Sequence, residues 1–232
     1  MLSDDTRTGR VCPMKCRVNE SYGCLLGESL AVGLPAYLVR FSGCNLDCRY
    51  CDTAYARTEP GEERSVDDIL AQVRSSGLGR VLLTGGEPML QADAVVALCQ
   101  SLVRDRVEVL VETNGTLPLD RLPSKVVKVV DVKTPGALPG ASPPPFLDAN
   151  LECLGGADQL KVVLSSIQDY DWAVAFLAAR SPLPLPPANV LFSPAWGQLG
   201  PAELADRMLQ DRLPFRFHLQ VHKVVWGERR GT

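Results

Sequence analysis

Residues 36–53, AYLVRFSGCNLDCRYCDT, join a continuous apolar run to a loop that carries three cysteines. The run at 36–42 is rich in large and β-branched apolar residues, which predicts a buried strand that ends at the following glycine. Cys44, Cys48 and Cys51 come next, with the spacing C-x3-C-x2-C. The stretch therefore predicts a strand that has a group of thiols directly after its carboxyl end.

After a short irregular start, strand and helix signals alternate along the rest of the chain. Further apolar runs that predict strands lie at 80–84, 107–112, 126–132, 159–164, 189–192 and 215–222. Apolar residues at helical spacing predict helices between the N-cap Ser65 and Gly77, and over about 92–103, 167–180 and 201–211. The strand runs are almost continuously apolar, which is typical of parallel strands that are buried on both faces.

Two features limit the barrel that these units can form. Residues 133–150, KTPGALPGASPPPFLDAN, contain five prolines and are expected to be a loop where a helix would otherwise connect two strands. The seven expected strands and about four helices are too few for a complete eight-unit barrel. We therefore expect an α/β fold, an incomplete TIM-like barrel of six or seven parallel strands with a reduced number of helices, as one domain over residues 1–232.

Clusters of unusual polar residues follow nearly every expected strand. They are GCNLDCRYCDT (43–53), TGGEP (84–88), ETNG (112–115), DVKTP (131–135), SPAW (193–196) and His222. Parallel α/β folds build their active sites at the carboxyl ends of the strands, because these ends and the following loops converge there. The sequence therefore predicts one active site at this edge of the sheet.

The composition excludes several classes of protein. The chain has 24 Lys and Arg residues against 27 Asp and Glu residues, and its net charge of −3 argues against a protein that coats nucleic acid. No apolar run approaches the roughly 20 residues that span a bilayer. The polar start MLSDDTRTGR lacks the apolar core of a signal peptide. We therefore expect a cytoplasmic protein that binds neither nucleic acid nor a membrane.

The spacing of the cysteines points to a metal centre. In a large chain without a secretion signal the thiols are expected to be reduced, and three so close together suit metal binding better than disulfides. Cys44, Cys48 and Cys51 can bind three irons of a [4Fe–4S] cluster and leave one iron open, because the next cysteine is Cys99. The alternative is a structural zinc site, which requires a fourth ligand nearby, whereas both histidines are far along the chain.

Together with TGGEP (84–88), the cysteine loop resembles the radical S-adenosylmethionine (SAM) superfamily, and the aromatic Tyr50 fits the same pattern. The resemblance implies that the open iron chelates the amino and carboxylate groups of SAM. It implies that one electron from the cluster then cleaves SAM to methionine and a 5′-deoxyadenosyl radical. It also implies that TGGEP binds the methionine end of SAM, where two glycines allow close approach and Glu87 adds a compensating charge.

Further segments extend the resemblance over most of the chain. They are NESYGCLLGES (19–29), GLPAYLVRFSGCNLDCRYCDTAYA (33–56), TGGEPMLQ (84–91), ETNGT (112–116), DVKTPG (131–136), LKVV (160–163) and LQVHKVVWG (219–227). Together they resemble the 7-carboxy-7-deazaguanine synthase family. That family converts 6-carboxy-5,6,7,8-tetrahydropterin to 7-carboxy-7-deazaguanine with loss of ammonia, in the pathway to queuosine and other 7-deazapurines. The resemblance implies a reduced barrel, a homodimer, SAM that is regenerated in each turnover, and an electron donor such as flavodoxin or ferredoxin.

The same resemblance implies roles for individual residues. Those expected to bind the pterin substrate, the last two as catalytic residues, are Leu26, Gly27, Glu28, Arg40, Thr84, Glu112 and His222. Those expected to line SAM are Gly86, Glu87, Asp131, Val132, Lys133, Ser193, Pro194, Ala195 and Trp196. Arg40 is the expected contact to the substrate carboxylate, because its fork of donors suits a carboxylate. Thr53 matches a contact to Mg²⁺, for which a hydroxyl, waters and substrate oxygens form a suitable shell.

Several of these positions have a simpler interpretation, and some depart from the family. Arg40 could be a solvated strand residue, Thr53 a turn hydroxyl, and His222 a histidine with only a structural partner. Leu26 stands where the family usually has Gln, so one hydrogen bond to the pterin has to be lost or supplied elsewhere. Three cysteines lie outside the family's pattern, and we interpret them as incidental thiols rather than as a second cluster; they are Cys12, Cys16 and Cys24.

Two other functions remain as alternatives. One is a radical SAM enzyme that activates a glycyl-radical enzyme, which would share the cysteine triplet and a compact barrel. Such activating enzymes lack the Gly-Glu-Ser turn at 27–29 and the HKVVWG ending at 222–227. The other is a non-enzymatic iron–sulfur electron carrier, against which the GGEP (85–88) and ETNG (112–115) clusters argue, because a carrier needs no pocket for SAM.

Overall fold

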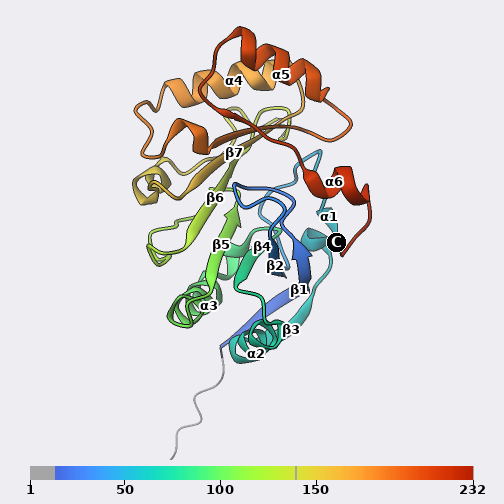
Figure 1. The fold of residues 1–232 in the computed structure, drawn as a ribbon, viewed down its shortest axis with the longest axis vertical. Helices are drawn as coiled ribbons and strands as arrows, with labels where there is room; N and C mark the ends of the chain where they lie inside the picture. The colour runs from blue at the N-terminus through green and yellow to red at the C-terminus, as the bar shows by residue number, and fades with distance from the viewer. Residues whose placement is uncertain (1–13, 139, 232) are drawn as a thin grey trace, which may run out of the picture.

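A twisted sheet of mostly parallel strands positions the clusters of polar residues that follow the strands (Figure 1). The computed structural model describes residues 14–138 and 140–231, and in this part of the chain the strand order is β3-β1-β2-β4-β5-β6-β7-β8-β9. The strands that run parallel to one another are β2 (Pro35–Phe41), β4 (Arg80–Gly85), β5 (Glu108–Thr113), β6 (Val127–Val132), β7 (Gln159–Leu164), β8 (Val190–Pro194) and β9 (Arg216–Phe217). The α/β class and the incomplete parallel barrel that the sequence predicted are therefore confirmed.

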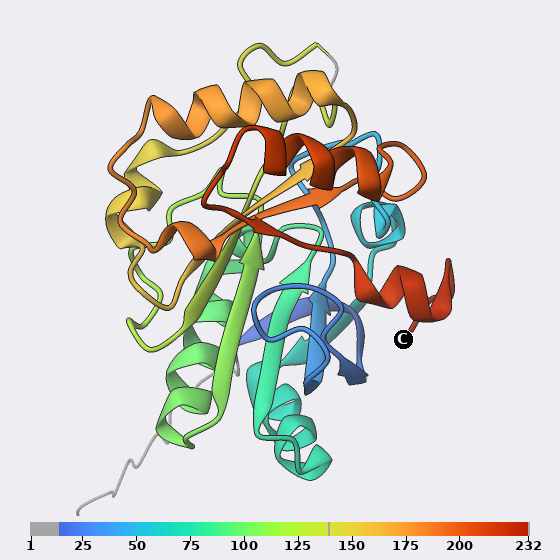
Figure 2. The same ribbon diagram turned by 45° about the horizontal axis from the view of Figure 1, so that its top comes forward.

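Helices cover the outside of the sheet (Figure 2). The longer ones are α2 (Val66–Ser76), α3 (Ala92–Arg104), α4 (Ile167–Ala178) and α5 (Pro201–Gln210). The short ones are α1 (Ala54–Thr58), α6 (Val221–Trp226) and the 3₁₀ turns η1 (Pro88–Gln91), η2 (Asp148–Cys153) and η3 (Pro187–Asn189). As predicted, Ser65 caps α2, since its Oγ accepts a hydrogen bond from the Asp68 N–H at 3.1 Å, and Gly77 ends the helix with a positive φ of 67°.

The alternation of side chains along the strands separates two apolar layers. Residues such as Val39, Leu83 and Val111 are fully buried and belong to the large core that the helices share with the outer face of the sheet. A smaller cluster fills the other face of the same strands and consists of Leu26, Ala36, Leu110 and Val129. The strands are thus apolar on both faces, which explains their continuous apolar sequences.

Two of the sequence expectations are wrong. The irregular start contains β1 (Lys15–Leu25), an antiparallel strand that pairs with both β2 and β3 (Glu62–Ser65). The expected strand over 215–222 is reduced to the two residues of β9, and the chain then enters α6. The last apolar segment stands at the edge of the sheet and pairs only with β8 in the described residues, so its sequence can form a helix instead.

The Pro-rich segment 133–150 is a loop, as expected: among its described residues no strand or α-helix forms before η2 begins at Asp148. The loop leaves this side of the barrel without the usual crossover helix. None of the helices in residues 14–138 and 140–231 has the length and apolar character that a membrane crossing requires.

Candidate active site

A cavity of about 390 Å³ opens at the carboxyl ends of the parallel strands. Its wall is formed by the ends of β2, β4, β5, β6 and β7, the turn after β1, the cysteine loop after β2, the start of α6 and the loop after β8. The clusters that the sequence predicted to share one rim therefore do surround one cavity.

Side chains two residues apart on four neighbouring strands build the inner wall in two layers. Three of the strands contribute an apolar residue below a polar one, in the pairs Leu38 and Arg40, Leu82 and Thr84, and Val129 and Asp131. The fourth, β5, contributes Glu112, and Leu110 two residues before it belongs to the small apolar cluster beneath. Alternate residues of a strand lie on one face. The polar member is always the second-to-last residue of its strand, so the ends of the strands define a polar layer above an apolar floor.

The cysteine loop forms one wall of this cavity, and Cys44, Cys48 and Cys51 all line it. Burial raises the pKa of the Cys48 thiol to about 11 and also raises that of Cys44. The neighbouring thiols add to both shifts, because like charges that lie close together disfavour each other. The three sulfurs thus lie near one another and face the same space.

This donor set fits an iron–sulfur cluster. In the described ranges, no three His, Cys, Asp or Glu side chains meet around a single ion. A [4Fe–4S] cube does not require such convergence, because each thiolate binds a different iron. Three thiols on one short loop, all facing one cavity, provide ligands for three irons and leave space beside the fourth.

The loop after β4 packs directly on the cysteine loop. The Glu87 N–H donates to the Gly43 carbonyl at 2.8 Å. A Cβ atom at Gly86 would overlap with that same carbonyl group and with the Cβ of Cys44. Position 86 therefore requires glycine, and the two loops keep a fixed separation beside the thiols.

The side chain of Glu87 does not face the cavity. It is fully buried, and its Oε1 accepts hydrogen bonds from the Met89 N–H at 2.9 Å and the Thr113 hydroxyl at 2.8 Å. Its Oε2 accepts from the Asn114 N–H at 2.7 Å. Glu87 therefore ties the loop to the end of β5, and the compensating charge that the sequence suggested for it is not presented to the cavity.

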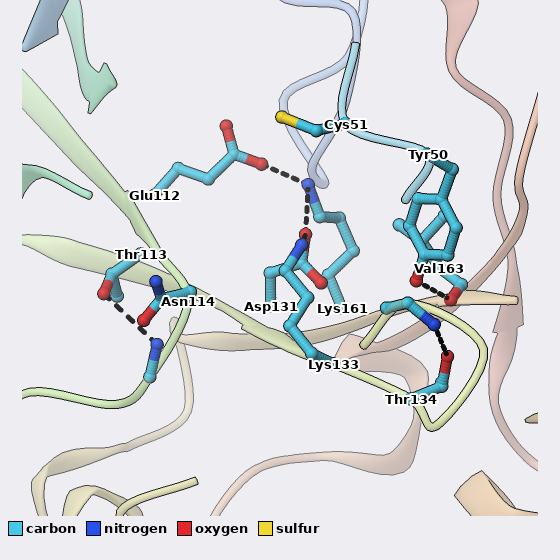
Figure 3. Close-up of polar contacts among 12 residues, drawn as sticks. Tyr50, Cys51, Glu112, Thr113, Asn114, Asp131, Lys133, Thr134, Lys161 and Val163 are labelled. Atoms are coloured by element: carbon cyan, nitrogen blue, oxygen red, sulfur yellow. Dashed lines mark hydrogen bonds and ion pairs between the residues drawn. The ribbon is translucent and has the colours of Figure 1, made fainter. Parts of the chain in front are cut away.

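A buried lysine lies at the centre of the polar layer (Figure 3). The Nζ of Lys161, on β7, is 2.6 Å from Glu28 Oε2, in direct contact with Glu112 Oε1, and 3.2 Å from Asp131 Oδ2. Asp131 Oδ2 also lies 2.8 Å from the Nζ of Lys133. Two lysines and three carboxylates thus form one connected charged group.

Arg40 is held at the opposite side of the cavity by a second network. Its Nε donates to Glu20 Oε1 at 2.7 Å, and the same oxygen accepts from the Tyr55 hydroxyl at 2.7 Å. The Nε of Arg230 donates to Glu20 Oε2 at 3.3 Å, and its guanidinium lies 3.8 Å from the centre of the Tyr55 ring. The basic end of the chain thus folds back beside Arg40 rather than extending away from the site.

His222 reaches the cavity from α6 rather than from a strand. Its Nε2 lies 3.2 Å from Asp52 Oδ2, and a Cβ at Gly27 would overlap with its imidazole ring. The Val221 N–H donates to the Gly27 carbonyl at 2.9 Å, which docks α6 on the turn after β1. Although burial alone would raise the pKa of Asp52, the hydrogen bond and charge of His222 lower it to about 2.

The two histidines are expected to titrate on opposite sides of their ordinary pKa of about 6.5. Burial lowers the pKa of His218. Burial also acts to lower the pKa of His222, but the hydrogen bond to Asp52 and the charge of Glu28 outweigh it, and the pKa is raised. The stabilisation from protonated His222 is therefore fully present below about pH 6.5 and is lost as the pH rises through the folded-state pKa.

An NMR titration of the two imidazoles in cluster-free protein checks this order. Asp52→Asn should lower the pKa of His222 and leave that of His218 nearly unchanged. If His222 titrated at or below the pH at which His218 does, the described Asp52–His222 pair would be contradicted.

The structure brings most of the predicted residues to the cavity, but four predicted SAM residues do not line it: Glu87, Val132, Ser193 and Pro194. Ser193 is fully buried behind the wall. Leu26 lines the cavity from the apolar floor, in the small cluster with Leu110 and Val129. The position at which the resemblance leads us to expect Gln is therefore part of the apolar floor of the cavity here.

The main site residue that the sequence analysis missed is Lys161. A signal was present, because it interrupts the buried strand QLKVVL (159–164), and a lysine in such a strand needs a charged partner. Of the three incidental cysteines, Cys12 lies outside the described residues. Cys16 and Cys24 are both on β1 and eight residues apart, which at about 3.3 Å per residue places them roughly 26 Å from each other. These two thiols therefore cannot share a cluster.

Comparisons with known proteins agree with this geometry. The model of the Radical SAM superfamily matches residues 38–132, which run from within β2 through the cysteine loop to the end of β6. A 7-carboxy-7-deazaguanine synthase from Koribacter versatilis is 37% identical over 223 residues, covering 90% of this chain and 96% of the relative. A protein of the same name from Chlorobaculum tepidum is 38% identical over 212 residues, covering 90% and 94%.

Among solved structures, a crystal structure of QueE from Escherichia coli is similar, with a TM-score of 0.69. The match covers 90% of this chain and 95% of that chain. At 22% sequence identity it supports the fold. The two relatives above, which are more similar in sequence, support the family.

Proposed function

Because the chain belongs to the 7-carboxy-7-deazaguanine synthase family, whose members are radical SAM lyases, we propose that it converts 6-carboxy-5,6,7,8-tetrahydropterin to 7-carboxy-7-deazaguanine with loss of ammonia. The product would enter the biosynthesis of queuosine and other 7-deazapurines. The observation that supports this most is a single cavity with three thiols in one wall and a layer of charged hydrogen-bonding groups beside them.

The residues around the cavity suit two ligands that lie side by side. Cys44, Cys48 and Cys51 would hold the [4Fe–4S] cluster. SAM would lie against Gly86, Asp131, Lys133, Ala195 and Trp196, all of which line the cavity. When bound, the reduced cluster and SAM supply the one-electron chemistry that generates a carbon-centred radical.

On the substrate side, the chain's own residues bind the pterin and orient its ring. Arg40 donates to the pterin carboxylate, for which its planar fork of N–H groups is suited. Glu28 and Glu112 accept hydrogen bonds from the amino and ring N–H groups. Thr84 lies 3.4 Å from Glu112 and supports it. His222 and its partner Asp52 close the side formed by α6 and exclude water from the reacting ring.

We further propose that Thr53 contributes to a Mg²⁺ site shared with oxygens of the substrate. Its side chain lines the cavity, 3.8 Å from the sulfur of Cys51. A hydroxyl is a suitable ligand for so hard an ion, but a weak one, so waters and substrate would complete the shell.

Thr53→Ala is therefore expected to weaken the response to Mg²⁺. The Mg²⁺ concentration for half-maximal activity should rise about tenfold, which corresponds to the loss of roughly 1.4 kcal/mol. Thr58→Ala is the matched control, because this hydroxyl bonds only to the Tyr55 carbonyl in the described residues and does not line the cavity. An unchanged Mg²⁺ response in Thr53→Ala would remove this residue from the metal site.

The proposal includes two partners that the family suggests. One is a protein reductant of the flavodoxin or ferredoxin class, which would supply the electron. The other is a second copy of the chain, which would form a homodimer. We propose both partners for an enzyme that works in the cytoplasm and binds neither nucleic acid nor a membrane.

The function is tested by incubating the reconstituted and reduced protein anaerobically with SAM, Mg²⁺ and 6-carboxy-5,6,7,8-tetrahydropterin. Mass spectrometry should detect 7-carboxy-7-deazaguanine in amounts that exceed the enzyme many times. Cleavage of SAM that occurs only with a glycyl-radical enzyme as partner would favour the activating-enzyme alternative. A failure to bind SAM would favour the electron carrier.

A further inference from the structure

Lys161 contacts carboxylates on both the proposed substrate side and the proposed SAM side of the polar layer. It pairs with Glu28 from the turn after β1, with Glu112 from β5, and with Asp131 from β6. Asp131 in turn pairs with Lys133, which lies towards the cysteine loop near Cys48. The Lys161 side chain is only 5% exposed, so these contacts are not loosened by bulk water.

The backbone leaves Lys161 little choice of position. β6 and β7 are parallel, and Lys161 is the register partner of Asp131. Its ammonium therefore lies between the ends of the strands, where it contacts Glu112, the second-to-last residue of β5. Other titratable groups near this cluster are Lys133, His218, His222 and Asp52. The ammonium of Lys161 is therefore surrounded by both acidic and basic side chains.

The carboxylates around Lys161 are only partly satisfied. Glu28 Oε1 and Asp131 Oδ1 are buried and have no hydrogen-bond partner in residues 14–138 and 140–231, whereas the other oxygen of each carboxylate is bound to Lys161. A buried acceptor without a donor is costly, which indicates that a ligand supplies the donor. Lys161 thus fixes one oxygen of each group and leaves the other available.

We propose that Lys161 is a positioning residue that sets the acceptors for the substrate ring. By binding Oε2 of Glu28 and Oε1 of Glu112, it aims the unpartnered Glu28 Oε1 and the Glu112 Oε2, which also accepts from Thr84 at 3.4 Å, at a heterocycle that presents neighbouring N–H groups. Without its charge, the three carboxylates repel one another, and their separation no longer matches the ring. The inference rests on the proposed function, since it names a pterin as the ring.

The experiment compares Lys161→Met and Lys161→Arg with the control Lys128→Met. Lys128 is also a buried lysine, 4% exposed, and its Nζ is 3.2 Å from Asp158 Oδ2, but neither residue lines the cavity. Loss of the Lys128 ammonium therefore also removes the charged partner of a buried carboxylate, away from the site. Thermal unfolding and the spectrum of the reconstituted cluster show whether each variant is folded.

Binding is measured on the reconstituted enzyme with SAM, by quenching of the fluorescence of 6-carboxypterin, an oxidised and unreactive probe. Lys161→Met should weaken binding at least about tenfold, which is 1.4 kcal/mol. Lys161→Arg keeps the charge but moves the donors, so it should be folded and still bind at least about threefold more weakly. Lys128→Met should bind as the wild type does. If Lys161→Met does not fold, the Arg variant decides.

Turnover provides a second readout that a merely structural role would not change. In the Lys161 variants the KM for the substrate should rise more than kcat falls, and more 5′-deoxyadenosine should form per molecule of product. If the folded Lys161 variants bound the probe as tightly as the wild type and formed no more 5′-deoxyadenosine per molecule of product, the positioning role would be overturned. The proposed function would still stand. Failure of the wild-type enzyme to bind the pterin probe would instead contradict the proposed substrate and, with it, this inference.

Discussion

The Cys48→Ala variant is expected to lose the cluster and with it all formation of 5′-deoxyadenosine and of product. Cys48 is the middle thiol of the loop and lines the cavity beside Cys44 and Cys51. With two thiolates left, a cube has two irons without a protein ligand, and it is not retained. Iron and sulfide analysis after anaerobic reconstitution, with a product assay on the same sample, measures both effects.

Cys153→Ala is the matched control for this variant. Cys153 is a half-buried free thiol at the end of η2, and it does not line the cavity. Its replacement removes a thiol without touching the loop, so iron content and turnover should remain at the wild-type level. Retention of a full cluster in Cys48→Ala would refute the ligand set.

The Arg40→Met variant should lose about 10²-fold in kcat/KM, mainly through a higher KM for the carboxylated pterin. Removing one partner of a charged hydrogen-bonded pair costs roughly 2–5 kcal/mol, and about 2.7 kcal/mol corresponds to this factor. The fold should tolerate the change, because Glu20 keeps its contacts to Arg230 and Tyr55. Steady-state kinetics at saturating SAM measure the effect.

Arg80→Met is the control for the loss of an arginine on a neighbouring strand. Arg80 is the first residue of β4 and pairs with Glu108 at 2.5 Å. It therefore lies at the amino ends of the strands, whereas the cavity is at their carboxyl ends. This variant should be slightly less stable and should keep its KM. If Arg40→Met bound the substrate as tightly as the wild type, Arg40 would not be the contact to the carboxylate.

Much of the fold could be predicted from the sequence because its signals are local. The helix over 66–76 has a Ser cap, a glycine end and a regular apolar face, and the structure has it at the predicted bounds. The segments that were wrong lack such signals. β1 has the mixed sequence KCRVNESYGCL, and it becomes a strand through its pairing with β2 and β3, which only the assembled sheet provides. Segment 215–222 is apolar enough for a strand, but of its described residues only Arg216 and Phe217 pair with β8, and the rest of the segment lies outside this pairing.

The site shows the same division between local and distant information. The cysteine loop and the polar ends of the strands are short motifs, and their meeting in one cavity follows from the parallel sheet. The role of Glu87 could not be predicted, because its partners Thr113 and Asn114 lie at and just after the end of β5, far along the chain. The place of Lys161 depends on three carboxylates from three other segments. Long-range pairing therefore decides which charged residues face the ligand.

Electron paramagnetic resonance of the anaerobically reconstituted and reduced protein, recorded with and without SAM, tests the central claim most directly. A cluster that is held by Cys44, Cys48 and Cys51 and has one open iron should give the signal of a reduced [4Fe–4S] centre. That signal should change when SAM is added, and ¹⁷O- or ¹⁵N-labelled SAM should show coupling to the iron. A cluster signal that is absent, or one that is present but indifferent to SAM, would contradict the account.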